Sequence, residues 1–288
     1  SLYAPKALVR QLVASDTPPA LGGERRDVTV FFMDLENFTA MSSHLEPEEV
    51  MLRMSQYFER VTEILHAHGA TIDKYIGDAV VAMYGAPIEL PDHAYRACLT
   101  AIRVQEKLEV CRAKWRSEGD RWPEIVHGMR NRIGINTGSV IVGNMGSRSR
   151  FSYTMMGDDV NLAARMESGA KSWGAYTMCT EATKVACEQH AGDAIVFRPL
   201  GRIVVKGRSQ ATPVHEIVGL KKSVSEETLQ CLARFAEGLA HYFAQEWDAA
   251  EQSFQRSADL ELLIPGKAAG VSSNPSLVYL EIVRRFRN

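Results

Sequence analysis

The order in which strand-like and helix-like stretches follow one another restricts the fold of this chain more than any other feature. Residues 28–33 (VTVFFM) form a β-branched and aromatic run that predicts a buried strand. Apolar side chains recur at helical spacing over 47–66, which predicts a helix. The stretch 71–85 (TIDKYIGDAVVAMYG) predicts two strands joined by a tight turn at Gly77 and Asp78.

The next part of the chain continues this pattern. A long helix is predicted over about 92–115, followed by short strands at 131–136, 139–144 and 151–156 and by a helix that starts near Asp158. Strand, helix, strand, strand, helix, strand is the order of a split βαβ unit. We therefore predict an α+β fold, a ferredoxin-like, palm-like sheet with helices on one face, plus a C-terminal α-helical extension.

Changes in composition divide the chain into three segments. We predict a short leading helix and a linker over residues 1–26. The sheet domain is predicted over 27–220, and a helical extension over 221–288. Six positions of the extension resemble one tetratricopeptide-type helical hairpin: Gly238, Leu239, Tyr242, Ala249, Phe254 and Ala258. One such repeat cannot bury a core by itself, so we expect it to pack on the sheet domain, on a dimer partner or on further repeats. A plain structural cap and a site for a protein partner stay open as its role.

Composition and charge exclude several classes of function. The 288 residues carry a formal net charge of −2, which does not favour nucleic acid as a partner. No apolar run reaches the roughly eighteen residues of a membrane span, so we expect no membrane insertion by this segment. The five cysteines are scattered, without a CxxC pair, which favours a reducing cytoplasm over disulfides or zinc. Because the chain opens with Ser1, a longer protein with an N-terminal sensor domain or membrane anchor is an open alternative.

Two aspartates stand where the predicted topology brings strand ends together. Asp34 follows the first strand, and Asp78 lies in the turn that starts the third. Because these strands are expected to be antiparallel neighbours, the two carboxylates should meet at one edge of the sheet. Converging carboxylates favour Mg²⁺ or Mn²⁺. Ordinary turn chemistry of aspartate is the alternative interpretation.

Two further patterns are compatible with phosphate chemistry. Helix-forming sequence follows Asp34, so the backbone N–H groups of Phe38 and Thr39 are candidates for binding a polyphosphate. Asn161 and Arg165 are four residues apart and therefore share one helix face. Arginine suits the stabilisation of a phosphoryl group in transfer. A solvated helix face is the alternative interpretation.

Five segments of the chain, in this order and spacing, resemble the class III nucleotide cyclases: VTVFFMDLENFT, TIDKYIGDAVVAMYGAP, GINTGSVIVGNMG, YTMMGDDVNLAARME and VKGRSQATPVHEIV. The resemblance covers about Arg25 to Gly219. It implies an adenylate cyclase that converts ATP to 3′,5′-cyclic AMP and pyrophosphate in signal transduction. It further implies a pair of divalent ions, Mg²⁺ or Mn²⁺, held by Asp34, the backbone carbonyl of Leu35, and Asp78.

The resemblance also assigns the nucleotide contacts. Lys74 and Thr154 match the pair that reads adenine, and Thr154 is typical of a subgroup often stimulated by bicarbonate. Asn161 and Arg165 match the transition-state pair. Lys206 matches a phosphate-binding lysine, and Arg150 and Arg208 are weaker phosphate candidates.

In this family, one protomer supplies the metal ligands and the other the purine and transition-state residues. All of them occur in this chain, so the resemblance implies a homodimer with two equivalent sites. Three other interpretations compete: a non-catalytic nucleotide-binding regulatory module, a guanylate cyclase and a diguanylate cyclase. Lys74 and Thr154 oppose the second, and the absence of a GG[DE]EF turn opposes the third. The regulatory input, whether bicarbonate, a sensor domain or a protein partner, is not specified by these motifs.

Overall fold

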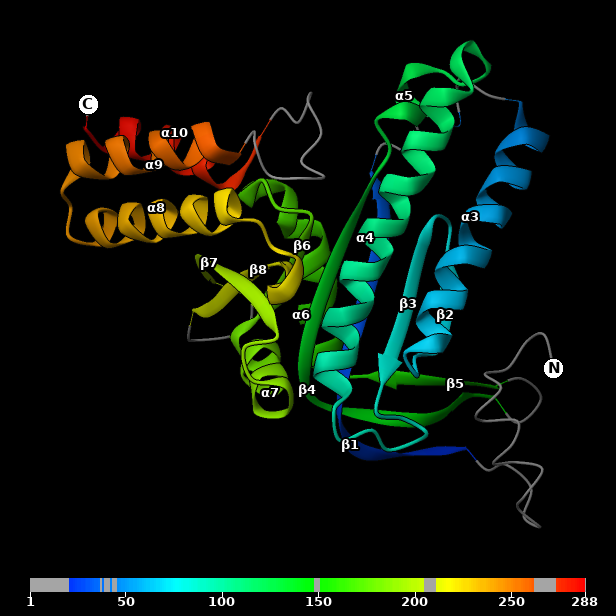
Figure 1. Ribbon diagram of the computed structural model, residues 1–288. Helices are drawn as coiled ribbons and strands as arrows, with labels where there is room; N and C mark the ends of the chain where they lie inside the picture. Colours follow the sequence, from blue (N-terminus) through cyan, green and yellow to red (C-terminus); the bar gives the residue numbers. More distant parts are fainter. Residues whose placement is uncertain are drawn as a thin grey trace.

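The computed structural model describes residues 21–36, 38, 42, 46–147, 151–204, 211–261 and 273–287. Within them, eight strands form one sheet in the order β2-β3-β1-β4-β6-β8-β7, with β5 paired to β4 (Figure 1). The predicted leading helix lies outside these residues. The strands are β1 (Gly22–Glu36), β2 (Thr71–Ile76), β3 (Ala79–Tyr84), β4 (Arg130–Gly146), β5 (Phe151–Met156), β6 (Thr177–Thr180), β7 (Ile195–Ile203) and β8 (Thr212–Leu220).

Helices lie between several of these strands in the sequence, and further helices follow β8. The α-helices are α3 (Pro47–Ala67), α4 (His93–Ser117), α5 (Glu124–His127), α6 (Asp158–Gly169), α7 (Glu181–Ala191), α8 (Glu226–Phe243), α9 (Trp247–Glu261) and α10 (Pro275–Arg287). Among the described residues, the 3₁₀ turns are η1 (Gly119–Arg121), η2 (Ala170–Trp173) and η3 (Lys221–Ser223). The predicted α+β fold is confirmed. No helix of the described residues is both long and apolar enough to cross a membrane.

The centre of the sheet is a pair of long strands, β1 and β4. They are antiparallel partners from Gly22 opposite Asn144 to Glu36 opposite Arg130. The prediction of two short strands at 131–136 and 139–144 is therefore wrong, since β4 is continuous. Thr137 and Gly138 interrupt the apolar pattern, but their backbone stays paired with β1, and the Thr137 hydroxyl lies 2.8 Å from that of Thr29.

The end of β1 lies beside the turn between β2 and β3. β1 and β3 are antiparallel, with Met33 opposite Val80. The turn uses Gly77 at φ +62°, a left-handed conformation that glycine adopts without strain. This arrangement is the predicted one, and it places Asp34 and Asp78 at the same edge of the sheet.

Helices cover both faces of the sheet, which corrects the prediction of helices on one face. Ile133 and Ile135 of β4 belong to the core beneath α3, α4 and α7. Gly134 lies between them and faces the opposite side, where a Cβ on it would fall 2.0 Å from the backbone nitrogen of Glu167 in α6. Since side chains alternate along a strand, α6 lies on the second face.

The C-terminal helices share this second face. Leu162 and Met166 of α6 belong to one buried cluster with Phe235, Phe254 and Tyr279 of the extension. In Figure 1, α8, α9 and α10 stack beside β7 and β8, well away from α3. The extension therefore packs on the sheet domain, one of the three expected arrangements. Its likeness to a tetratricopeptide hairpin and the domain limits stay predictions.

Candidate active site

Asp34 and Asp78 lie in direct contact, as the topology predicts. Their carboxyl groups are within hydrogen-bonding reach of each other, and the backbone N–H of Leu35 donates to Asp78. Burial and the neighbouring charge of Asp34 raise the pKa of Asp78 to about 6. Two carboxylates held this close repel each other until a proton or a cation lies between them.

Arg132 and Glu167 extend this site, and sequence reasoning missed both. Arg132 is the register partner of Asp34, and its guanidinium donates to Asp34 Oδ2 at 3.0 Å. The same guanidinium forms an ion pair with Glu167 Oε1 of α6 at 3.1 Å. Burial, together with the charges of Asp34 and Asp78, raises the pKa of Glu167 to about 7, although Arg132 opposes the shift. A polar chain thus connects Asp34 on β1 to helix α6.

The donor set at this edge fits a hard divalent cation. Among the described residues, no three or more His, Cys, Asp or Glu side chains gather as a metal site. The contact between Asp34 and Asp78 makes this carboxylate pair, with the predicted carbonyl of Leu35, the candidate set of ligands. Mg²⁺ typically takes only one or two protein carboxylates and completes its shell with water and substrate phosphate oxygens.

Lys74 on β2 and Thr154 on β5 also meet. Lys74 Nζ lies 3.3 Å from Thr154 Oγ1, although the two residues are far apart in the sequence. A third residue, which the sequence analysis did not select, completes the group: Thr154 Oγ1 donates to Asp73 Oδ2 at 2.8 Å. Lys74 Nζ lies 3.5 Å from the same carboxylate oxygen. The two predicted nucleotide-reading side chains therefore form one polar cluster with Asp73.

Comparison with known proteins identifies the family. The profile of the Adenylate and Guanylate cyclase catalytic domain matches residues 23–219. This chain belongs to that family. Adenylate cyclase 1 of Rhizobium meliloti is 39% identical over 225 residues, which cover 78% of this chain and 32% of the relative. The chain thus spans about a third of the length of that relative.

Solved cyclase structures have the same fold. The adenylyl cyclase CyaB from P. aeruginosa is 31% identical, with a TM-score of 0.61, over 71% of this chain and all of that one. The guanylyl cyclase Cya2 is 30% identical, with a TM-score of 0.58, over 70% of this chain and 97% of the other. These similarities show a cyclase catalytic domain and include both base specificities.

Helix α6 presents the predicted transition-state pair of this cyclase domain. The side chain of Asn161 is exposed and that of Arg165 is half-buried, whereas Leu162 and Met166 point into the core. The start of α6 is held by buried Asn136, whose amide donates to the backbone carbonyl of Asp159 at 2.9 Å. No hydrogen bond or ion pair among the described residues joins Asn161 to Asp34 or Asp78.

The remaining predicted phosphate ligands are only partly visible. Thr39, Arg150, Lys206 and Arg208 lie outside the described residues. Phe38 is described, and its side chain packs against the main hydrophobic core.

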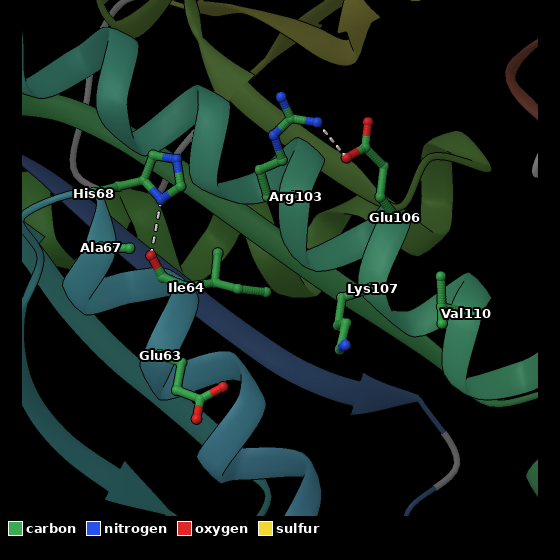
Figure 2. Close-up of a pocket in the computed structure, with 8 residues that line it drawn as sticks. All are labelled: Glu63, Ile64, Ala67, His68, Arg103, Glu106, Lys107 and Val110. Atoms are coloured by element: carbon green, nitrogen blue, oxygen red, sulfur yellow. Dashed lines mark hydrogen bonds and ion pairs between the residues drawn. The ribbon is translucent and has the colours of Figure 1, made fainter.

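A groove of about 440 Å³ lies elsewhere, between the outer helices α3 and α4 (Figure 2). Its polar walls include the ion pair of Arg103 with Glu106 and the imidazole of His68, whose Nδ1 lies 2.8 Å from the carbonyl of Ile64. None of the predicted site residues that the structure describes lines this groove. It is therefore separate from the described part of the predicted nucleotide site.

Proposed function

We propose that this chain is an adenylate cyclase that converts ATP to 3′,5′-cyclic AMP and pyrophosphate. The observation that carries the proposal is the pair of clusters within one cyclase domain: Asp34 with Asp78, and Lys74 with Thr154. The relative from Rhizobium meliloti, which is named an adenylate cyclase, supports the same base specificity.

Asp34 and Asp78 would hold two divalent ions, Mg²⁺ or Mn²⁺, together with the carbonyl of Leu35. When bound, such ions lower the pKa of the ribose 3′-hydroxyl and neutralise charge on the triphosphate. The chain's own part is to keep both carboxylates at the end of β1 and in the β2–β3 turn, so that they face the same space. Arg132 beside Asp34 adds a fixed positive charge that suits a phosphate oxygen.

Lys74 and Thr154 would read the adenine base. The Lys74 ammonium only donates, so it pairs with N1 of adenine, an acceptor, and opposes guanine, which carries a hydrogen there. The Thr154 oxygen accepts from the 6-amino group. Asn161 would orient the ribose, and Arg165 would stabilise charge on the α-phosphate as the 3′-oxygen attacks.

We further propose a homodimer with shared active sites. Six large apolar side chains are exposed on β2, β4 and β5, which lie together at one end of the sheet: Tyr75, Ile76, Ile141, Met145, Phe151 and Met156. A two-fold axis through this surface would cover it and bring α6 of one protomer to the carboxylates of its partner. An Asp34→Ala protomer mixed with an Arg165→Ala protomer should then regain one intact site. Absence of any rescue would contradict shared sites.

The deciding experiment compares ATP and GTP as substrates of the purified chain, with Mg²⁺ and with Mn²⁺. We expect cyclic AMP from ATP and little product from GTP. Asp34→Ala and Asp78→Ala should abolish turnover while the protein stays folded. Near-normal activity of either variant would overturn the metal assignment.

A guanylate cyclase is the second candidate, because the guanylyl cyclase Cya2 is structurally nearly as similar as CyaB. Cyclic GMP as the main product would establish it. Bicarbonate stimulation, proposed from the identity of Thr154, is tested in the same assay by adding bicarbonate at constant pH. No change in turnover would remove bicarbonate as an activator.

A further inference from the structure

The single hydrogen of the Thr154 hydroxyl is already committed within the protein. Thr154 Oγ1 donates it to Asp73 Oδ2 at 2.8 Å, and an ionised carboxylate can only accept. The Lys74 ammonium, which can only donate, lies 3.3 Å from the same hydroxyl oxygen. The Thr154 oxygen therefore offers any further partner a lone pair and no hydrogen.

Asp73 is firmly held in this arrangement. Its side chain is only 3% exposed, and its Oδ2 also lies 3.5 Å from Lys74 Nζ. The pairing of β2 with β3 shifts register between Ile72 and Lys74, so two consecutive residues both reach Thr154 instead of pointing to opposite faces. Burial raises the pKa of the Asp73 carboxyl, and the hydrogen bond from Thr154 opposes that shift.

We propose that Asp73 is a positioning residue for base selection, which fixes the Thr154 hydroxyl as a hydrogen-bond acceptor. This inference rests on the proposed adenine-reading role of Lys74 and Thr154. Adenine presents an amino group at position 6, which donates to that lone pair. Guanine and hypoxanthine present a carbonyl oxygen there, so that two acceptors would face each other. Asp73 thus rejects 6-oxopurines without touching the base.

This rejection of 6-oxopurines through Thr154 is separate from the selection made by Lys74. Lys74 tests position 1 of the purine, where adenine accepts and guanine donates, whereas Thr154 tests position 6. Without Asp73, the Thr154 hydroxyl would be free to rotate. It could then accept from an amino group or donate to a carbonyl oxygen, and its discrimination would be lost while that of Lys74 remained.

The test is the ratio of kcat/KM for ATP to kcat/KM for inosine triphosphate, whose base has the 6-oxo group but no 2-amino group. For Asp73→Ala we expect this ratio to fall by roughly tenfold, the usual scale for one mismatched buried hydrogen bond. The fall should come from increased turnover of inosine triphosphate. A merely structural defect lowers both values together and leaves the ratio unchanged. Asp73→Asn keeps the shape of the side chain and should give an intermediate ratio, so it decides the matter if Asp73→Ala does not fold.

A double-mutant cycle and a matched control complete the experiment. In a Thr154→Val background there is no hydroxyl to orient, so Asp73→Ala should no longer change the ratio. Asp92→Ala removes another carboxylate that pairs with a cation, Arg96 of α4, and should leave the ratio at the wild-type value.

The outcomes separate this inference from the proposed function. If the wild-type protein uses inosine triphosphate or GTP as well as ATP, the proposed base reading is wrong, and the role of Asp73 falls with it. If the wild-type protein selects ATP but both Asp73 variants keep its ratio, the proposed function stands and the role of Asp73 is overturned.

Discussion

The proposed metal ligands Asp34 and Asp78 place two like charges in contact, which should lower the stability of the metal-free protein. The two carboxyl groups are held together by β1 and by the β2–β3 turn, and the raised pKa of Asp78 reflects burial and the charge of Asp34. At neutral pH, the protein without metal keeps two like charges in contact, which a bound cation would neutralise.

Replacing one of these charges should therefore stabilise the metal-free protein. In Asp78→Asn the amide can donate to Asp34, and we expect a melting temperature about 2–4 °C above wild type in the presence of a chelator, equivalent to roughly 1 kcal/mol. Adding Mn²⁺ should raise the melting temperature of the wild-type protein but not that of the variant. An Asp78→Asn protein that melts below wild type without metal would contradict the repulsion, and one stabilised by Mn²⁺ would contradict the assignment of Asp78 as a ligand.

At the residue scale, the sequence predicts contacts that follow from the order of the strands. It misses contacts that depend on which residues are paired across two strands. Asp34 and Asp78 flank neighbouring strand ends, so their meeting could be predicted. Arg132 contacts Asp34 because it is the cross-strand partner, and that pairing is visible only once β1 and β4 are aligned. Asp73 contacts Thr154 because the pairing of β2 with β3 shifts register beside it, and no pattern in the sequence predicts that shift.

Among the elements, α6 packs on β4 at a position that only glycine, Gly134, can occupy without a clash. A Cβ on Gly134 would lie 2.0 Å from the nitrogen of Glu167 and 2.4 Å from the carbonyl oxygen of Ala163, both backbone atoms of α6. Glycine at this position lets the helix approach β4 closely enough to hold Asn161 and Arg165 in place.

Gly134→Ala should therefore push α6 away from the sheet. We expect a loss of about 3 kcal/mol in the free energy of unfolding, the upper end for overpacking, and a clear fall in turnover of the folded protein. Urea unfolding and kinetic assays measure the two effects. Gly169→Ala at the end of the same helix is the control, because its Cβ would meet only Met178 Cε at 3.5 Å. Equal effects of the two variants would contradict this account.

A buried ion pair network joins the extension to the sheet domain. Arg198 of β7 donates to both carboxylate oxygens of Glu261 in α9, each at 2.7 Å, and pairs with Glu216 of β8 at 2.8 Å. Arg198, Glu216 and Glu261 are all buried. Burial alone would lower the pKa of Arg198, but the two carboxylates outweigh it and raise the pKa, so the guanidinium stays charged.

Removing one member of this network should be costly. We expect Glu261→Ala to lower the free energy of unfolding by about 3–5 kcal/mol, since it leaves part of a buried charge uncompensated. Glu251→Ala, which removes a carboxylate that pairs with Arg284 and Arg287 near the surface, should cost no more than about 1 kcal/mol. Denaturant unfolding of the two variants makes the comparison. Similar losses for both would show that Arg198 does not depend on Glu261.

Helices were easier to predict than strands. The long helices begin and end within a few residues of their predicted limits because their apolar spacing persists over many turns. β1 is much longer than predicted, since its first half, residues 22–27, carries mostly polar residues and glycines. That half is a strand because it pairs with residues 139–144 of β4, a long-range condition that a local pattern does not contain.

At the scale of the whole molecule, the proposed homodimer depends on the exposed apolar surface of β2, β4 and β5. Ile141 and Met156 are register partners and are 38% and 49% exposed. Met156→Lys would bury an unpaired charge at a two-fold interface, at a cost of roughly 3 kcal/mol or more. We expect monomers in sedimentation experiments and a fall in turnover that higher protein concentration partly reverses.

The control for this variant lies on helix α7, apart from β5 (Figure 1). Val185 of α7 is 41% exposed, so Val185→Lys introduces the same charge at a similarly exposed apolar position. It should change neither the sedimentation behaviour nor the turnover. A Met156→Lys protein that remains dimeric and active would place the dimer surface elsewhere.

The buried cluster beneath α6 shows that the region matched by the family is smaller than the unit that packs as one core. The family match ends at residue 219, yet Leu162, Met166 and Leu200 share one buried cluster with residues of the helices that follow it. A protein trimmed at that limit would keep every predicted catalytic motif and expose an apolar surface under α6. Such a fragment should aggregate or lose α6, so experiments on this cyclase domain should begin with the C-terminal helices in place.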